Sequence, residues 1–413
     1  MAVVSAQRDF AVQIVNRLRE AGHTALFAGG CVRDLLLGRE SNDFDVATTA
    51  RPNEVRELFG HRRTLAVGAS FGVIVVIGPP ELGHVEVATF RTDLDYVDGR
   101  RPEGIAFCSP EEDALRRDFT INGMFFDPID ERVIDYVGGE EDLKGRLVRA
   151  IGDPHDRMRE DKLRMLRAVR FTAILDFSLD PITADAIRQM SSELVVVSAE
   201  RIAQELKKML VDRNRRRAVE LSEDMLLLRI ILPELNELQK QSDWSTTLRR
   251  LELLERPSFE LAMAALLQSL DSKSAVNKIC RRLKLSNDEI ERICWLVEHQ
   301  RDLDDASQLS LALLKRLLAH PFRSDLLQFV EADRTAKELG IEPIAFCREF
   351  LRSTPMDQID PLPLVTGDDL VAMGLRPGPK FKQVLDTIRD AQLNLELTNR
   401  EDALERARIE WNA

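Results

Sequence analysis

Two carboxylates stand one residue apart, Asp43 and Asp45, a short way after the paired glycines Gly29 and Gly30. Alternation along a β-strand would project both carboxylates from one face of a sheet. Carboxylates placed in this way can converge on hard divalent cations that also hold phosphate oxygens. The glycines end a predicted strand and open a helix, so their backbone N–H groups suit a phosphate, and Arg33 one turn later can fork onto its oxygens. The spacing therefore predicts a site for metal ions and a phosphorylated substrate; the alternative is a tight turn before a solvated acidic loop.

A further acidic candidate is Glu86, which stands between Val85 and Val87 in a predicted strand. Alternation turns its side chain away from these apolar neighbours, toward the same metal ions if its strand lies beside that of Asp45. An exposed glutamate on an edge strand fits the pattern equally well. The residues leave both interpretations open.

Adjacent arginines precede an apolar run in the segment Arg116-Arg117-Asp118-Phe119-Thr120-Ile121-Asn122. Guanidinium groups beside a rigid strand can hold nucleotide phosphates or ribose hydroxyls. A surface cluster of ion pairs has the same composition, and spacing alone does not separate the two.

A predicted helix carries four polar residues at intervals of three, namely Asp161, Arg164, Arg167 and Arg170. With 3.6 residues per turn they form one oblique ridge opposite an apolar stripe. A carboxylate beside an arginine can offer an acceptor and a donor to the Watson–Crick edge of a base. Taken alone, this helix is better explained as a solvated surface with ion pairs between residues three apart.

The elements that must position these residues change in character near residue 152. Before it, β-rich runs alternate with helical patterns, which predicts a compact α/β or α+β unit. The expected strands are 25–28, 44–47, 73–77, 85–90, 105–107, 124–126 and 133–136, and the expected helices include 32–37 and 53–59. After it, strands disappear from the prediction and helical periodicity, broken at prolines, continues to the end.

Composition excludes several classes of protein. The 413 residues carry a net charge of −12, which counts against a general nucleic-acid binder unless cations cluster locally. No stretch reaches the roughly 20 apolar residues needed to cross a bilayer, and the first residues lack the features of a secretory signal, so no membrane is expected. The 5 cysteines are scattered without a CxxC pair, which fits a reducing cytoplasm.

Together these motifs, within roughly residues 20–210, resemble those of the class II tRNA nucleotidyltransferases (the CCA-adding enzymes) and their poly(A) polymerase relatives. The resemblance implies an α+β fold class, with an N-terminal polymerase-β-like nucleotidyltransferase head followed by all-helical neck, body and tail domains. The implied boundaries are 1–145 for the catalytic head, 146–212 for a neck that selects the nucleotide, 213–330 for the body and 331–413 for the tail. The body and tail would bind tRNA, and the body is His-Asp-like but degenerate, since Gln268 and Ser269 stand where some relatives have a His-Asp pair.

The resemblance also implies roles for individual residues. Asp43 and Asp45 would be catalytic and would hold two Mg²⁺ ions, with Glu86 as a third candidate ligand. Glu160, Asp161 and Arg164 would pair with the base of CTP or ATP in place of a nucleic-acid template. The residues expected to bind the nucleotide are Gly29, Gly30, Arg33, Arg117, Asp118, Asn122, Asp161, Arg164, Arg167 and Arg170.

Clusters of cations in the helical part are expected to follow RNA phosphates through A-form shape. Their members are Lys207, Lys208, Arg213, Arg215, Arg216, Arg217, Arg281 and Arg282. Solvated helix faces are the alternative for each cluster.

The expected function is therefore extension of tRNA 3′ ends with CCA, or with its terminal A, by attack of the 3′-hydroxyl on the α-phosphate of CTP or ATP. Residues 91–102 resemble a flexible loop of CCA-adding and A-adding relatives, which disfavours a C-only enzyme. The alternatives are a poly(A) polymerase, an A-only enzyme that works with a separate CC-adding enzyme, and a non-catalytic RNA-binding relative. The expected partners are the tRNA 3′ end and CTP and/or ATP, with no partner protein, in the cytoplasm.

Overall fold

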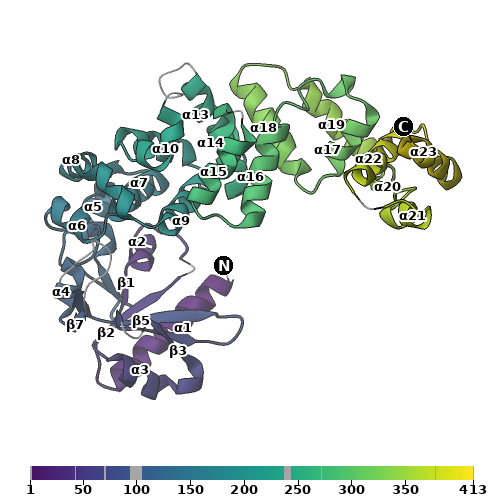
Figure 1. Ribbon diagram of the computed structural model, residues 1–413. Coiled ribbons are helices and arrows are strands. Elements are labelled where there is room, and N and C mark those ends of the chain that lie inside the picture. Colours follow the sequence, from purple (N-terminus) through teal and green to yellow (C-terminus); the bar gives the residue numbers. More distant parts are fainter. Residues whose placement is uncertain are drawn as a thin grey trace. The chain divides into compact units, whose positions relative to one another are not determined.

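The computed structural model describes residues 2–41, 43–68, 71–93, 105–236, 243–270, 272–376 and 378–412. The chain forms two compact units, Met1–Pro233 and Glu234–Ala413 (Figure 1). The predicted α+β class is confirmed, because a sheet occupies the start of the first unit and helices make up most of the remainder. Most of the predicted loop at 91–102 lies outside the described residues.

A seven-stranded sheet organises the first part of unit 1, in the order β3-β4-β5-β2-β1-β8-β9. Neighbouring strands are antiparallel except for β2 and β5, which are parallel. The strands of this sheet are β1 (Ala25–Ala28), β2 (Asp45–Thr48), β3 (Thr64–Gly68), β4 (Val73–Ile77), β5 (His84–Thr89), β8 (Phe125–Asp127) and β9 (Arg132–Ile134). A separate antiparallel pair joins β6 (Arg91–Asp93) to β7 (Ile105–Phe107). The expected strands are thus present with shifts of one or two residues at their ends, while β3 and β6 are outside the expected set.

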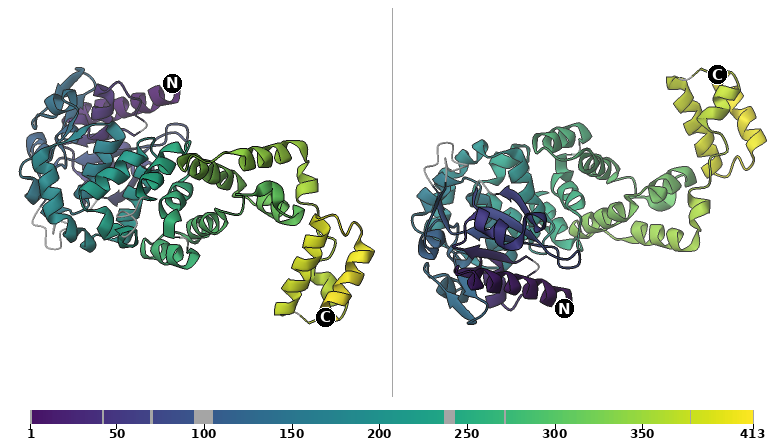
Figure 2. Two further views of the ribbon diagram at one scale, coloured as in Figure 1. Left: turned by 90° about the horizontal axis from the view of Figure 1, so that it is seen from above. Right: turned by 90° about the horizontal axis from the view of Figure 1, so that it is seen from below.

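Three helices pack against this sheet, one before its first strand and two between strands. Helix α1 (Ala2–Glu20), which is outside the expected elements, contacts β1 and β2, and Figure 2 shows it in dark purple alongside the sheet. Helix α2 (Gly30–Leu36) follows β1 directly, and α3 (Pro52–Phe59) contacts β3, β4 and β5. The core on one face combines alternate residues of the central strands, including Leu26, Ala47 and Phe125.

The rest of unit 1 is helical apart from one short strand pair. Its helices are α4 (Pro110–Leu115), α5 (Gly139–Lys144), α6 (Pro154–Glu160), α7 (Arg164–Leu175), α8 (Pro181–Met190), α9 (Ala199–Leu210), α10 (Arg215–Asp224) and α11 (Leu228–Ile231). Strand β11 (Ser178–Leu179) pairs in parallel with β10 (Leu147–Val148), so the prediction that strands end near residue 152 is wrong at this one place.

The predicted continuous helix through the polar ridge is also wrong. Helix α6 ends at Glu160, and Asp161 takes an extended backbone conformation with φ −146° and ψ 105°. The Asp161 carboxylate accepts a hydrogen bond from the Leu163 N–H at 3.0 Å, and its carbonyl accepts one from the Arg164 N–H at 3.0 Å. Aspartate competes with helical hydrogen bonding through such local contacts, so the chain leaves α6 at Asp161 and α7 begins at Arg164.

Unit 2 consists of packed helices. They are α13 (Asp243–Leu253), α14 (Phe259–Leu267), α15 (Lys273–Arg282), α16 (Asn287–His299), α17 (Leu311–Ala319), α18 (Arg323–Ala336), α19 (Glu342–Ser353), α20 (Met356–Ile359), α21 (Gly367–Ala372), α22 (Pro379–Leu393) and α23 (Arg400–Asn412). A buried ion pair between Arg250 of α13 and Asp333 of α18, at 2.8 Å, ties two of them together. Within the described ranges, none of the helices is long and apolar enough to cross a membrane.

The four-part division of the chain stays a prediction. Helix α10, which that division places at the start of the body, packs against α7 and α9 of unit 1.

Candidate active site

One pocket of unit 1, with a volume of about 490 Å³, brings most of the predicted nucleotide-binding residues together. Its size is in the range of small-molecule sites. Its lining consists of Gly29, Gly30, Arg33, Asp45, Arg116, Arg117, Asp118, Asn122, Asp161, Arg164, Arg167 and Phe171. Asp43, Glu86, Glu160 and Arg170 are the predicted metal-binding or nucleotide-binding residues that are not part of this lining.

The turn between β1 and α2 brings backbone to the pocket wall. Gly29 has φ 75° and ψ −134°, a conformation that glycine adopts readily and other residues rarely do. A side chain there would also approach Arg117 Nη1, at 3.5 Å from an ideal Cβ. The glycine therefore keeps this corner open for a ligand.

The carboxylates Asp45 and Glu86 lie directly opposite each other in the parallel pairing of β2 with β5. Residues paired across a ladder project from the same face, so both side chains point to one side of the sheet. Burial, together with the negative charges of Asp43 and Glu86, raises the pKa of Asp45 to about 7, although Arg117 opposes the shift. This mutual repulsion among oxygen ligands is what a hard divalent cation would relieve, so the donor set fits such an ion.

Glu86 is exposed, as is Asp43. In the part of the chain that the structure describes, no three acidic, histidine or cysteine side chains converge closely enough to form a metal cluster. The role of Glu86 as a ligand therefore stays a prediction.

Asp113, which was outside the predicted site, orients both arginines of the Arg116-Arg117 pair. The residue is 1% exposed, and its Oδ1 accepts from Arg116 Nε at 2.9 Å while Oδ2 accepts from Arg117 Nη2 at 2.8 Å. Burial would raise the pKa of Asp113, but the charges of Arg117 and Arg116 outweigh it and lower the pKa. The sequence contains one signal for this role. Asp113 stands three and four residues before the arginines, and residues with this spacing are neighbours on a helix.

Asp118 is the point where the segment after α4 meets α7. Its Oδ2 accepts from Arg167 Nε at 2.8 Å, and its Oδ1 accepts from the Phe119 N–H at 2.8 Å and Asn122 Nδ2 at 3.2 Å. Burial would raise the pKa of Asp118, but the ion pair with Arg167, the charge of Arg164 and the bond from Asn122 lower it to about 2. Asn122 in turn accepts from Arg33 Nη1 at 2.8 Å.

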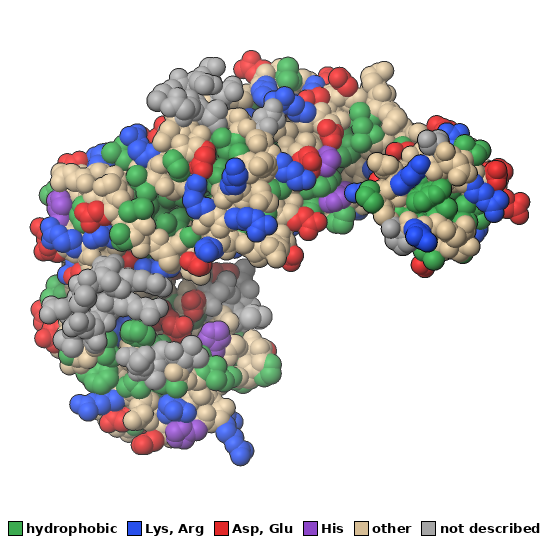
Figure 3. Space-filling model, in the orientation of Figure 1, with side chains coloured by type: hydrophobic (Ala, Val, Ile, Leu, Met, Phe, Trp, Pro, Cys, Tyr) green, Lys and Arg blue, Asp and Glu red, His purple; other side chains and the backbone are tan. Residues whose placement is uncertain are grey.

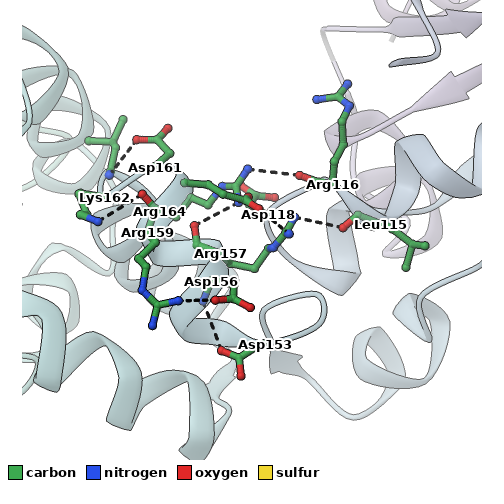
Figure 4. A network of polar contacts seen from close by, with 12 residues as sticks. Leu115, Arg116, Asp118, Asp153, Asp156, Arg157, Arg159, Asp161, Lys162 and Arg164 are labelled. Carbon is green, nitrogen blue, oxygen red and sulfur yellow. Dashed lines mark hydrogen bonds and ion pairs between the residues drawn. The ribbon is translucent and has the colours of Figure 1, made fainter. Parts of the chain in front are cut away.

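The corner between α6 and α7 holds the residues expected to read the base (Figure 4). Arg164 is 9% exposed and donates to Glu160 at 2.6 Å and to the carbonyls of Arg157 at 3.1 Å and Arg116 at 3.2 Å. Asp161 pairs not with Arg164 but with Arg201 of α9, at 2.6 Å. The carboxylate and the guanidinium are therefore each held by a separate partner, and both line the pocket.

Arg170 lies behind the pocket wall. It pairs with the buried Glu205 of α9 at 2.6 Å, one turn from Arg201 on the same helix. Its guanidinium carbon also lies 4.1 Å from the centre of the Phe171 ring, which lines the pocket. The contacts indicate that Arg170 positions Phe171 and α9 rather than lining the site.

The predicted RNA-binding cations have different surroundings. Arg215 is 3% exposed and donates to the Leu210 carbonyl at 3.0 Å, so its predicted contact with RNA is corrected to a structural role at the end of α9. Arg217 pairs with Asp176, and Arg282 pairs with Glu234. On the face drawn in Figure 3, basic side chains lie interspersed with acidic ones over the helices. The remaining predicted contacts, including exposed Lys208, stay predictions.

A sheet with an acidic strand, beside a cation-rich pocket that a glycine turn leaves open, is the arrangement of a nucleotidyltransferase. Residues 25–149 match the Poly A polymerase head domain, residues 176–239 a probable RNA- and SrmB-binding site of polymerase A, and residues 254–407 a putative domain 2 of tRNA nucleotidyltransferases.

Full-length relatives narrow the class. The chain is 35% identical to the CCA-adding enzyme of Pediococcus pentosaceus over 95% of both chains, and 35% identical to that of Bacillus subtilis over 97% of this chain and 96% of the relative. Its structure is similar to that of the Bacillus stearothermophilus CCA-adding enzyme in complex with CTP, with a TM-score of 0.78 and 31% identity over 98% of each chain. The protein belongs to the family of CCA-adding enzymes, which confirms the resemblance found in the sequence.

The buried charge of Asp118 predicts an acid dependence of stability. The pKa is about 2 in the folded protein and about 3.9 in an unfolded chain. Because the folded pKa is depressed, the contribution is complete above about pH 4 and is lost as the pH falls toward 2, by about 2 kcal/mol. Urea denaturation should show the wild type more stable than Asp118→Asn at pH 6, with the difference shrinking by this amount toward pH 2. A difference that stays constant over this range would contradict the assignment.

Proposed function

We propose that this protein completes the 3′ end of tRNA by adding C, C and A from CTP and ATP without a nucleic-acid template. The observation that carries the proposal is a single pocket that holds the glycine turn, Asp45, the Arg116-Arg117 pair and the Asp161–Arg164 corner. The names and full-length coverage of the relatives support CCA addition over the alternatives of A-only addition and poly(A) synthesis.

Base selection follows from the hydrogen-bond donors and acceptors of Asp161 and Arg164, at the corner between α6 and α7, that have no partner in the described part of the chain. Among the described residues, Arg201 and the Leu163 N–H occupy three of the roughly four acceptor positions of the Asp161 carboxylate, which leaves one on Oδ2. Arg164 uses three of its five N–H groups, which leaves Nε–H and one Nη2–H. The corner therefore offers one acceptor beside two donors.

Cytosine and adenine share the complementary edge. Each carries an exocyclic amino donor next to a ring-nitrogen acceptor, whereas uracil and guanine carry a carbonyl and an N–H at these positions. Asp161 would accept from the amino group and Arg164 would donate to the ring nitrogen. A protein edge of this kind selects C and A together and rejects U and G, because a mismatched base leaves buried polar groups unpaired.

The phosphates would lie at the other end of the pocket. Arg117 is oriented by Asp113 and lies beside Gly29, where backbone can approach a triphosphate closely. Asn122 and Asp34 hold Arg33, which presents its remaining N–H groups to the same wall. The tRNA 3′-hydroxyl would attack the α-phosphate in line, with pyrophosphate as the leaving group.

Asp43 and Asp45 would hold Mg²⁺, with Glu86 as a further candidate. When bound, the ions would supply charge that activates the 3′-hydroxyl and neutralises the leaving pyrophosphate. Metal binding at this site requires that the carboxyl of Asp45, whose pKa is raised, loses its proton.

Contact with tRNA is proposed for the cations that remain accessible, among them Lys208, Arg213 and Arg281, through phosphates rather than bases. The absence of disulfides among the five cysteines, all within described ranges, supports the proposal that the enzyme works in the cytoplasm.

Activity and subtype can be tested together. The protein is incubated with Mg²⁺ and labelled CTP or ATP on three substrates: tRNA lacking CCA, tRNA ending in CC, and an unrelated RNA. We expect CTP and then ATP to enter the first, ATP alone to enter the second, and neither to enter the third. Labelling of only the second would make it an A-adding enzyme, and long A tails on the unrelated RNA would make it a poly(A) polymerase.

Asp45→Asn should lower incorporation by about 1000-fold or more, since it removes a metal ligand while keeping the side-chain shape. Asp130→Asn, which alters an exposed carboxylate in the same head, should keep full activity. Equal activity of Asp45→Asn and the wild type would favour a non-catalytic RNA-binding protein.

Asp161→Asn should change base selection. The amide can donate as well as accept, so kcat/KM for CTP and ATP should fall about 100-fold while that for UTP falls less or rises. Asp156→Asn, on the exposed side of α6, is the matched control and should keep the wild-type preference. An unchanged preference in Asp161→Asn would remove this residue from base selection.

A further inference from the structure

A second pocket, with a volume of about 440 Å³, lies within unit 2 and shares no residue with the active site. Residues from α16, α17, α20 and α22 line it, and α17 packs against both α20 and α22 (Figure 1). Apolar side chains including Leu313, Leu317, Ile359 and Leu393 make up much of its wall. The pocket is therefore formed by a packed helical framework rather than by a loop.

Lys315 of α17 is the unusual residue in this lining. It is 4% exposed, and no acceptor or carboxylate is within bonding distance of its ammonium among the residues that the structure describes. Its ammonium nitrogen keeps some accessible surface, so the stem is buried while the charge faces the pocket. Burial, and next the positive charge of Arg389, lower the pKa of Lys315.

Arg389 of α22 adds a second cation with unused donors. Its Nη1 donates to the Pro361 carbonyl at 2.7 Å and to Gln392 at 3.0 Å, and its Nη2 pairs with Asp360 at 2.5 Å. These contacts use three of the five N–H groups of a guanidinium. Two cations therefore share a pocket with Asp360, whose carboxylate is 59% exposed at the rim and is already paired.

An aromatic wall stands beside the cations. The rings of Trp295 and His320 are parallel within 7°, with centroids 3.9 Å apart, and His320 Nδ1 accepts from the Phe322 N–H at 3.2 Å. Burial, and next the neighbouring His299, lower the pKa of His320, against the opposing charge of Glu291, so the ring is neutral at pH 7. The rings of Trp295, His299 and His320 all line the pocket, so aromatic side chains there can contact a planar ring of a ligand.

We propose that this pocket binds a small organic phosphate that carries a flat ring, with the phosphate at Lys315 and Arg389 and the ring against the wall of Trp295 and His320. A phosphate would supply the acceptors that Lys315 lacks, and charge-assisted bonds of this kind are the strong ones. A free small ligand fits better than an RNA backbone, because the ammonium lies inside a pocket and not on an accessible face. The site lies outside the machinery of nucleotide addition.

Tryptophan fluorescence can report binding, because all 3 tryptophans, Trp244, Trp295 and Trp411, belong to unit 2 and none to the active-site unit. The full-length protein is titrated separately with phenyl phosphate, AMP, phenol, inorganic phosphate and a short single-stranded RNA. We expect a saturable change with phenyl phosphate and AMP, and dissociation constants at least about tenfold higher for phenol and for inorganic phosphate. Lys315→Met should weaken phenyl phosphate binding at least about tenfold.

Two further variants make the test specific. Lys382→Met removes an exposed lysine of α22 and should bind phenyl phosphate as the wild type does. Leu313 lines the pocket and is 39% exposed. The larger side chain of Leu313→Phe narrows the pocket while Lys315 stays in place, so this variant should also weaken phenyl phosphate binding. Thermal unfolding checks that Lys315→Met folds as the wild type does.

The proposal is overturned if no saturable change occurs with either ring-bearing phosphate. Equal affinity of Lys315→Met and the wild type would also overturn it. Binding of the RNA in a Lys315-dependent manner, without binding of phenyl phosphate or AMP, would assign the pocket to RNA instead.

Discussion

The ion pair between the buried carboxylate of Asp118 and Arg167 is the contact on which the active site depends. It joins the segment that follows α4 to α7, and it continues through Asn122 to Arg33 beside the glycine turn. A buried carboxylate is tolerated only when it is paired and its other lone pairs are used, and Asp118 meets both conditions. The sheet end and the helix corner line the same pocket, and this contact holds them together with the bond from Arg164 to the Arg116 carbonyl.

Ion pairs between an arginine and an acidic residue recur around the pocket. Asp34 holds Arg33, Asp113 holds Arg117, and Glu160 holds Arg164, so each guanidinium reaches the pocket with its direction already fixed. The conformational entropy of these long side chains is therefore lost during folding and not on binding. A ligand then finds donors that need no rearrangement. The acidic partners also explain how a chain with net charge −12 can present cations to a triphosphate. Local pairing and exposure, not the total charge, decide where an anion can bind.

Much of the framework follows from local patterns. The strand from Asp45 and the helix from Pro52 lie within a residue or two of their expected positions, because alternation and a proline at the first turn act over a few residues. The family resemblance also led to most of the pocket lining, since its motifs are short and contiguous. Helix α1 is outside the elements that the sequence predicts, and periodicity alone does not register that the local hydrogen bond of Asp161 divides the polar ridge between two helices.

The sequence by itself determined which residue types stand on each face of each element, including the carboxylate at Asp45 and the apolar stripe behind Arg164. Only the tertiary structure decided which distant element covers that face. It placed Glu86 opposite Asp45, buried Arg215 against the end of the preceding helix α9, and enclosed Lys315 between helices without an acceptor among the described residues. Periodicity fixes the face to which each side chain points within one helix or strand. The residues that it contacts depend on strand register and helix packing, which are set by contacts between residues far apart in the chain.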